Sequence, residues 1–171
     1  MGEDRLEKLA QKLDRLAAAD ELRVQRAQEI EVLRRQASGR LHQLCAAFVA
    51  GVNRHLRHNA IQLTPETFQE EEFRQGGLNL IQMNAAGRVI QLRYQGTEPL
   101  ITKENWKTPY TLEGGIQWFN QEMLERDDVR EHRIYFCLEG KTNGWRYFDQ
   151  QSSKSGELDQ EYLVSLFEKI L

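Results

Sequence analysis

The chain has 171 residues, of which 40% are hydrophobic and 29% charged, and its net charge is −3. This length fits one ordinary domain, or a domain of about 110 residues with a helical extension, and the composition is that of a soluble globular chain. The charge is far from the strongly basic balance that would make nucleic-acid binding the leading hypothesis.

The charge is unevenly distributed: residues 1–58 hold 11 Lys/Arg and 8 Asp/Glu, whereas residues 59–171 hold 12 and 18. The amino terminus is charged throughout and lacks the apolar stretch of a secretory signal, and no segment approaches the roughly 20 apolar residues that cross a bilayer. Cys45 and Cys137 each lie within an apolar run, so we expect reduced core residues. A cytoplasmic protein without a membrane partner is therefore expected.

The first proline is Pro65, and the 64 residues before it are predicted to be largely helical. Four leucines follow the 3-4-3 spacing of a heptad seam and are called the leucine stripe below: Leu6, Leu9, Leu13 and Leu16. In a lone helix this stripe would face water. Continuing the heptad places Asp20 and Arg23 at seam positions, so a long regular coiled coil is not expected.

A second apolar stripe has helical spacing and is expected to pack on a core; it comprises Leu41, Leu44, Cys45, Phe48, Val49, Val52 and Leu56. Between the two stripes, Gly39 follows Ser38. Glycine in a helix interior costs about 1 kcal/mol relative to alanine, so we expect the helix to break or kink there. The predicted domains are a helical arm over residues 1–38 and an α+β domain over residues 39–171.

After residue 58 the apolar period changes from 3.6 to 2, which predicts strands. A short strand is expected over residues 59–63, and a hairpin joins residues 78–83 to residues 89–94 through a turn at residues 84–87. We expect residues 95–109 to be an irregular connection, with an edge strand near residues 100–102.

Three further elements complete the predicted domain. Residues 111–124 are predicted to form a helix whose apolar face contains Leu112, Ile116, Phe119 and Met123. A second hairpin joins residues 134–138 to residues 145–148 through a turn at residues 141–144 that contains Asn-Gly. A final helix capped by Asp159 is predicted to face inward through Tyr162, Leu163, Leu166, Phe167, Ile170 and Leu171.

The predicted fold is α+β: a long N-terminal helical arm followed by an antiparallel sheet of four to five strands. Antiparallel sheets usually bury one face and leave the other wet. The helices predicted over residues 41–57 and 159–170 are the natural cover for that face.

The sequence predicts no catalytic residue, cofactor or metal site. Gly140-Lys141-Thr142 is similar to the end of a phosphate-binding loop, but Tyr135 occupies the position of the required earlier glycine and a strand follows. His55 and His58 share a helix side without further ligands nearby, and Glu70, Glu71 and Glu72 are expected to form a solvated acidic turn.

Two groups of residues, each containing several aromatic side chains, suggest binding surfaces. A ligand or single-stranded nucleic-acid surface would combine Arg88, Arg93, Trp118, Trp145 and Tyr147. An apolar ligand cavity between helix and sheet would be lined by Leu92, Tyr94, Trp118 and Phe136. Because this part of the chain is acidic and Trp and Tyr commonly fill cores, we favour core or interface roles for them.

We therefore expect a non-enzymatic protein-interaction or scaffold module. It would form a homo-oligomer, or dock a protein partner, through the leucine stripe. The alternatives are a small-molecule or lipid-binding fold with helices over a sheet, and single-stranded nucleic-acid binding through sheet aromatics and helix arginines.

Overall fold

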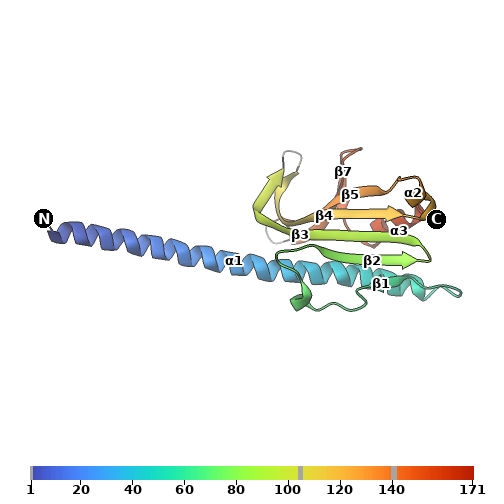
Figure 1. Ribbon diagram of the computed structural model, residues 1–171, viewed down its shortest axis with the longest axis horizontal. Helices are drawn as coiled ribbons and strands as arrows, with labels where there is room; N and C mark the ends of the chain where they lie inside the picture. The colour runs from blue at the N-terminus through green and yellow to red at the C-terminus, as the bar shows by residue number, and fades with distance from the viewer. Residues whose placement is uncertain (1, 104–105, 140–141) are drawn as a thin grey trace. The chain divides into compact units, whose positions relative to one another are not determined.

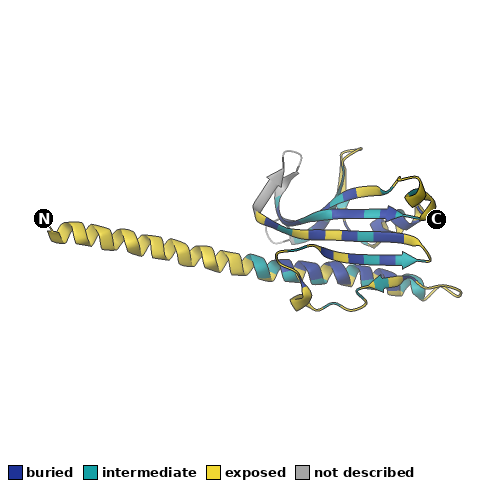
Figure 2. Ribbon diagram, viewed as in Figure 1, coloured by how far each residue is buried: buried dark blue, intermediate teal, exposed yellow. Residues whose placement is uncertain are grey.

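A computed structural model describes residues 2–103, 106–139 and 142–171. The chain divides into two compact units, Met1–Leu33 and Arg34–Leu171. Helix α1 spans Gly2–Asn53 and contributes to both. In the first unit, residues 2–29 are all exposed (Figure 2). They are rich in Ala, Leu, Glu, Lys, Arg and Gln, the residues with the highest helix propensity, which explains a helix there without a covering core.

The expected break at Gly39 is wrong, because α1 continues through it. Tertiary contacts hold this part of the helix in place. The Ser38 hydroxyl is hydrogen-bonded to the Tyr94 hydroxyl, and the indole Nε1 of Trp145 donates to the Ala37 carbonyl oxygen over 2.8 Å. Each such bond contributes about 1 kcal/mol, which is enough to offset the low helix propensity of one glycine.

Among its described residues, the second unit contains one antiparallel sheet of seven strands in the order β1-β2-β3-β4-β5-β6-β7 (Figure 1). The predicted count of four to five strands is too low. The strands are β1 (Gln62–Thr64), β2 (Asn79–Ala85), β3 (Arg88–Lys103), β4 (Trp106–Phe119), β5 (Arg130–Glu139), β6 (Thr142–Asp149) and β7 (Lys154–Glu157). A 3-10 helix, η1 (Glu70–Glu72), forms the exposed acidic turn, and two short helices are α2 (Gln121–Glu125) and α3 (Gln160–Glu168).

The first predicted hairpin is confirmed as β2 and β3, with Ile81 opposite Leu92 and Met83 opposite Ile90. Its turn is tighter than expected. Ala86 and Gly87 have φ values of 52° and 88°, which is the backbone of a two-residue turn with both central residues in the left-handed region.

The predicted helix over residues 111–124 is wrong: its first nine residues belong to β4, and only Gln121–Glu125 is helical. Leu112 and Ile116, four residues apart, fit a helical spacing, but together with Trp118 they also share one face of a strand. Gly114 decides between the two, because a Cβ there would overlap the backbone carbonyl of Arg93 on β3. Close approach of neighbouring backbones is a use of glycine within a sheet.

The expected irregular connection over residues 95–109 is replaced by the long ends of β3 and β4, with register shifts between Gly96 and Ile101 and between Ile101 and Lys103. Residues 104 and 105 lie outside the described residues. The second hairpin is confirmed as β5 and β6, but Asn143 and Gly144 pair with Leu138 and Cys137 within the strands. Residues 140 and 141, part of the predicted turn region, lie outside the described residues.

The core lies between one face of the sheet and two helices, the part of α1 after residue 34 and α3 (Figure 1). Its fully buried residues include Leu41 and Cys45 from α1, Leu163 and Leu166 from α3, and Ile81, Met83, Ile90, Leu92, Leu112, Ile116, Ile134 and Phe136 from the sheet. The two helices also contact each other, since the rings of Phe48 and Phe167 stack with centroids 5.7 Å apart.

The predicted start of the last helix is confirmed, because the Asp159 carboxylate accepts a hydrogen bond from the Tyr162 backbone N–H over 2.9 Å. Five of its six predicted inward residues are buried, but Leu171 is 81% exposed. Both cysteines are free and buried, as expected.

A smaller cluster occupies the opposite face of the sheet and contains Tyr110, Tyr135 and Cys137, with Phe148 packed against it. A register shift between Tyr110 and Leu112 on β4 places these two residues on different faces. Both faces are therefore partly apolar at this end of the sheet.

Candidate functional site

The leucine stripe lies in the first unit and faces solvent along its whole length. Leu6, Leu9, Leu13 and Leu16 are 66%, 54%, 56% and 56% exposed. Beside the stripe, the Lys8 ammonium and the Asp4 carboxylate, one helical turn apart, form an ion pair of 2.9 Å within α1. The stripe is thus a preformed helical surface of apolar side chains.

The stripe ends where the heptad continuation turns polar. Asp20 and Arg23, at the next two seam positions, are 3.8 Å apart, and their side chains are 71% and 82% exposed. An exposed ion pair of this kind contributes little to stability, and it interrupts the apolar surface. The usable apolar surface is therefore two heptads long.

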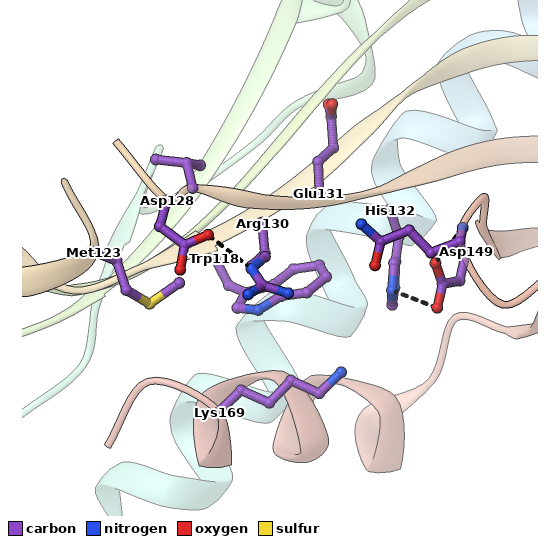
Figure 3. A pocket seen from close by; sticks show the side chains of 10 residues that line it. Trp118, Met123, Asp128, Arg130, Glu131, His132, Asp149 and Lys169 are labelled. Carbon is purple, nitrogen blue, oxygen red and sulfur yellow. Dashed lines mark hydrogen bonds and ion pairs between the residues drawn. The ribbon is translucent and has the colours of Figure 1, made fainter. Parts of the chain in front are cut away.

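A polar pocket of about 500 Å³ lies in the second unit, between β5, β6 and α3 (Figure 3). It is lined by Trp118, Met123, Asp128, Val129, Arg130, Glu131, His132, Asp149, Gln151 and Lys169. Figure 3 shows the indole of Trp118 at its centre, with Lys169 rising toward the pocket from the end of α3. The Lys169 ammonium lies 5.1 Å from the centre of that ring, a cation–π contact.

His132 is the buried titratable group of this pocket, with 9% of its surface exposed. Its Nδ1 lies 2.7 Å from the Tyr162 hydroxyl of α3, and its Nε2 lies 3.6 Å from the Asp149 carboxylate of β6. A neutral imidazole with its proton on Nε2 satisfies both contacts, because Nδ1 then accepts from the hydroxyl. The Trp118 ring meets His132 edge-on, with ring centroids 4.6 Å apart.

The surroundings favour the neutral form of His132. Burial lowers the pKa of His132; the Asp149 carboxylate raises it, and the nearby Lys169 ammonium lowers it. The pKa of Asp149 is itself lowered, chiefly by the hydrogen bond that Ser152 donates over 2.7 Å. Burial raises the pKa of Tyr162, so its hydroxyl keeps its proton and can donate to His132.

These contacts join three elements of the fold: β5 through His132, β6 through Asp149 and α3 through Tyr162. The Asp149 carboxylate next to His132 accepts a hydrogen bond from the Ser152 hydroxyl. Among the described residues, no hydrogen bond is present between Ser152 and the His132 imidazole. On the opposite side of the pocket, Arg130 is bonded to Asp128 over 3.0 Å. The arrangement therefore holds α3 on the sheet.

The predicted ligand or nucleic-acid surface is divided between different places. Trp118 and Trp145 are 4% and 6% exposed and lie on the face of the sheet that the helices cover. Tyr147 stacks on Tyr162 with ring centroids 4.0 Å apart. Arg93, which is exposed, lies on the opposite face of the sheet, whereas Arg88 is at the rim of a groove described below. The structure does not bring the two arginines and the aromatic rings onto one surface.

The residues predicted to line an apolar cavity pack against other side chains of the core. Leu92 and Phe136 are fully buried, and Tyr94 is 1% exposed. The Tyr94 ring meets that of Trp145 edge-on, with centroids 5.3 Å apart, and Trp145 meets Phe136 in the same way at 5.6 Å. These rings pack on one another within the core, at the place where the alternative hypothesis puts a ligand cavity.

An apolar groove does exist, but at the surface. It measures about 400 Å³ and lies where the end of α1 and the residues after it meet α3. It is called the apolar groove below, and its apolar lining is formed by Phe48, Val52, Leu56, Ile61, Ala85, Val164, Phe167 and Leu171. Leu56, Val164 and Leu171 are 41%, 43% and 81% exposed. Arg88 and Glu168 are charged residues at this groove.

Sequence reasoning missed both His132 and this groove. The signal for His132 was present, because it shares strand parity with Ile134 and Phe136 and therefore points to the same covered face. The groove had no such signal, since Val52 and Leu56 come from one helix end and Val164 from another element more than a hundred residues later.

The predicted histidine pair, His55 and His58, is exposed after the end of α1. Within the described residues, no group of three or more His, Cys, Asp or Glu side chains is arranged to hold a metal ion. In the same part of the chain, no helix is both long and apolar enough to cross a membrane. In comparisons with known proteins, no protein family model, no curated protein and no solved structure matches this chain.

Proposed function

We propose that this protein is an interaction or scaffold module that self-associates through its leucine stripe. The observation that supports the proposal is the exposure of all four leucines, each more than half exposed on one uninterrupted helix. A helix with an apolar stripe at heptad spacing is the form in which coiled-coil and bundle partners are recognised.

The size of the stripe sets the expected strength. Full burial of a leucine contributes about 1.5–3 kcal/mol, so a side chain already partly covered gains roughly 1–2 kcal/mol. The eight leucines of two copies would then contribute roughly 8–16 kcal/mol, against an association cost of about 4–15 kcal/mol. We therefore expect reversible association that depends on protein concentration.

A second copy is the favoured partner because heptad spacing is self-complementary. Ala10 and Ala17 follow Leu9 and Leu16 directly and are small, which permits close approach of another helix along the stripe. Every copy of the chain carries the same surface, so the concentration of the partner rises with that of the protein itself.

The test is the solution mass of the full-length chain, measured by light scattering over a range of concentrations. The wild type should exceed the monomer mass of 20.0 kDa as concentration rises. The double variant Leu9→Glu/Leu13→Glu should remain monomeric, because buried carboxylates would oppose pairing. Leu22→Glu is the matched control, since Leu22 is 47% exposed on the same helix but lies outside the stripe.

A wild type that remains at 20.0 kDa at every concentration would contradict self-association. Equal masses for the stripe variant and the wild type would show that another surface makes the contact. Circular dichroism of each variant verifies that the helix is retained.

A further inference from the structure

The polar pocket around Trp118 has the size and the lining of a small-molecule site. Its volume of about 500 Å³ is that of pockets that hold small ligands. The lining combines two apolar side chains, Met123 and Val129, with two cationic ones, Arg130 and Lys169. Met123 and Val129 are half-buried, so each still exposes apolar surface to a ligand. The pocket contains no residue of the leucine stripe, and a role for it is independent of the proposed function.

Lys169 carries a positive charge that no carboxylate within the described ranges offsets by an ion pair. Its ammonium lies 5.1 Å from the centre of the Trp118 ring, and Figure 3 shows it reaching into the pocket from the end of α3. Burial is the main cause of the lowered pKa of His132, and the Lys169 ammonium adds to this effect because it lies near the imidazole. A ligand anion would therefore meet a positive charge that is not already paired.

Two acids of the lining are either bonded within the protein or directed out of the pocket. The Asp149 carboxylate accepts hydrogen bonds from the Ser152 hydroxyl over 2.7 Å and from the Gln151 backbone N–H over 3.0 Å. The Glu131 side chain points away from the pocket in Figure 3. Its carboxylate lies over Gly115, on the opposite face of the sheet, where it would collide with a Cβ on that glycine.

Arg130 retains hydrogen-bond donors for a ligand. Its bond to Asp128, the third acid of the lining, uses Nε over 3.0 Å, and a guanidinium carries four further N–H groups on its two terminal nitrogens. Arg130 on β5 is directly opposite Trp118 on β4. Side chains at such positions are neighbours on one face of a sheet, so Arg130 and Lys169 both lie beside the same indole ring.

We propose that this pocket binds a small organic carboxylate with an aromatic or apolar body. The carboxylate accepts hydrogen bonds from the Lys169 ammonium and from the terminal nitrogens of Arg130, since such charge-assisted bonds are the strong ones. The body of the ligand packs on Met123 and Val129, which supply apolar surface in the same lining. The Trp118 indole, which is 4% exposed, holds Lys169 at the site through the cation–π contact.

The test is calorimetric titration of the full-length chain with three acids, benzoate, phenylacetate and 3-phenylpropionate. The matched ligands are the three corresponding amides, which have nearly the same shape and no charge. Lys169→Gln and Arg130→Gln each remove one cation from an exposed side chain. Arg88→Gln is the matched control, because it removes an exposed cation from the apolar groove, where an aromatic acid would also find an apolar wall beside a positive charge.

At least one of the acids should bind to the wild type and to Arg88→Gln with equal affinity, and its amide should not bind. Lys169→Gln and Arg130→Gln should each weaken the binding about tenfold, because each removes a charge-assisted contact. Nuclear magnetic resonance titration of His132 gives a second measurement. A bound carboxylate offsets the Lys169 charge, so saturation with the acid should raise the pKa of His132 in the wild type and leave it unchanged in Lys169→Gln.

Four results would each overturn the inference. The first is that none of the three acids binds, and the second is that an amide binds as tightly as its acid. The third is that Arg88→Gln loses the binding while Lys169→Gln keeps it, which would place the ligand in the apolar groove. The fourth is an unchanged pKa of His132 on saturation, because the ligand would then not lie beside Lys169. Circular dichroism verifies that each variant is folded, and the solution mass tests the proposed function separately.

Discussion

The buried His132 predicts that the stability of the second unit falls when the pH is lowered through the range in which histidine titrates. In the folded state its Nδ1 contacts the Tyr162 hydroxyl and the ring is 9% exposed, and burial lowers its pKa from the ordinary value of 6.5. The unfolded chain therefore takes up a proton at a higher pH than the folded chain does. The contribution of His132 to the free energy of unfolding is fully present well above pH 6.5, and it is lost as the pH falls through and below that value.

The magnitude has an upper limit set by one proton. The free energy of unfolding changes by at most about 1.36 kcal/mol per pH unit for each proton that only the unfolded state binds. Between pH 7.5 and pH 5.5, His132 can thus remove at most about 1.4 kcal/mol, since its unfolded form titrates near 6.5. The lowered pKa of Asp149 acts at lower pH, because its stabilising effect is lost only below its ordinary value of 3.8.

The assay is urea unfolding followed by tryptophan fluorescence at several pH values between 5.5 and 7.5. Wild type and His132→Gln are compared, because glutamine retains hydrogen-bonding groups but does not titrate. His55→Gln/His58→Gln is the matched control, since both of these histidines are exposed. The pH dependence should be smaller in His132→Gln than in the other two proteins.

Equal pH dependence in wild type and His132→Gln would refute the reasoning. Nuclear magnetic resonance titration of the His132 ring in the wild-type chain provides an independent measurement, which does not depend on the stability of the variant. A ring that titrates at or above pH 6.5 would contradict the inferred environment.

Three further predictions concern the core. Leu163→Ala should lower the free energy of unfolding by about 2–5 kcal/mol, because Leu163 is fully buried. Val164 is its neighbour and is 43% exposed, so Val164→Ala should change the free energy of unfolding by about 0.5 kcal/mol or less. Urea unfolding measures both changes. Gly114→Ala should lower the melting temperature strongly, since its Cβ would overlap the backbone of β3, and Gly144→Ala should not, because nothing lies within 4 Å of its Cβ. The Cys45 thiol, whose pKa burial raises to about 12, should resist a thiol reagent in the folded chain and react in urea.

Local patterns predicted several elements correctly because their causes are local. The first hairpin follows from the alternation of Ile90, Leu92 and Tyr94, which only a strand pairs on one face. The last helix follows from Asp159, whose carboxylate satisfies a free N–H of the first turn wherever that helix packs.

The errors occurred where two local structures fit the same residues. Leu112 and Ile116 are four apart, which suits a helix and a strand equally, and the decision came from the close backbone of β3 at Gly114. Gly39 has low helix propensity, yet the helix continues because Ala37 and Ser38 are bonded to residues of the sheet. Such contacts join residues far apart in the chain and have no local signal.

The sequence by itself determined that a leucine stripe at heptad spacing would form on a helix, because spacing and propensity act over a few residues. The tertiary structure alone decided which side chains lie together in space. It placed Trp118, Trp145 and Tyr147 on the face beneath the helices and surrounded His132 with residues of β6 and α3. It also assembled the apolar groove from the two ends of the second unit, since only folding brings such distant residues into contact.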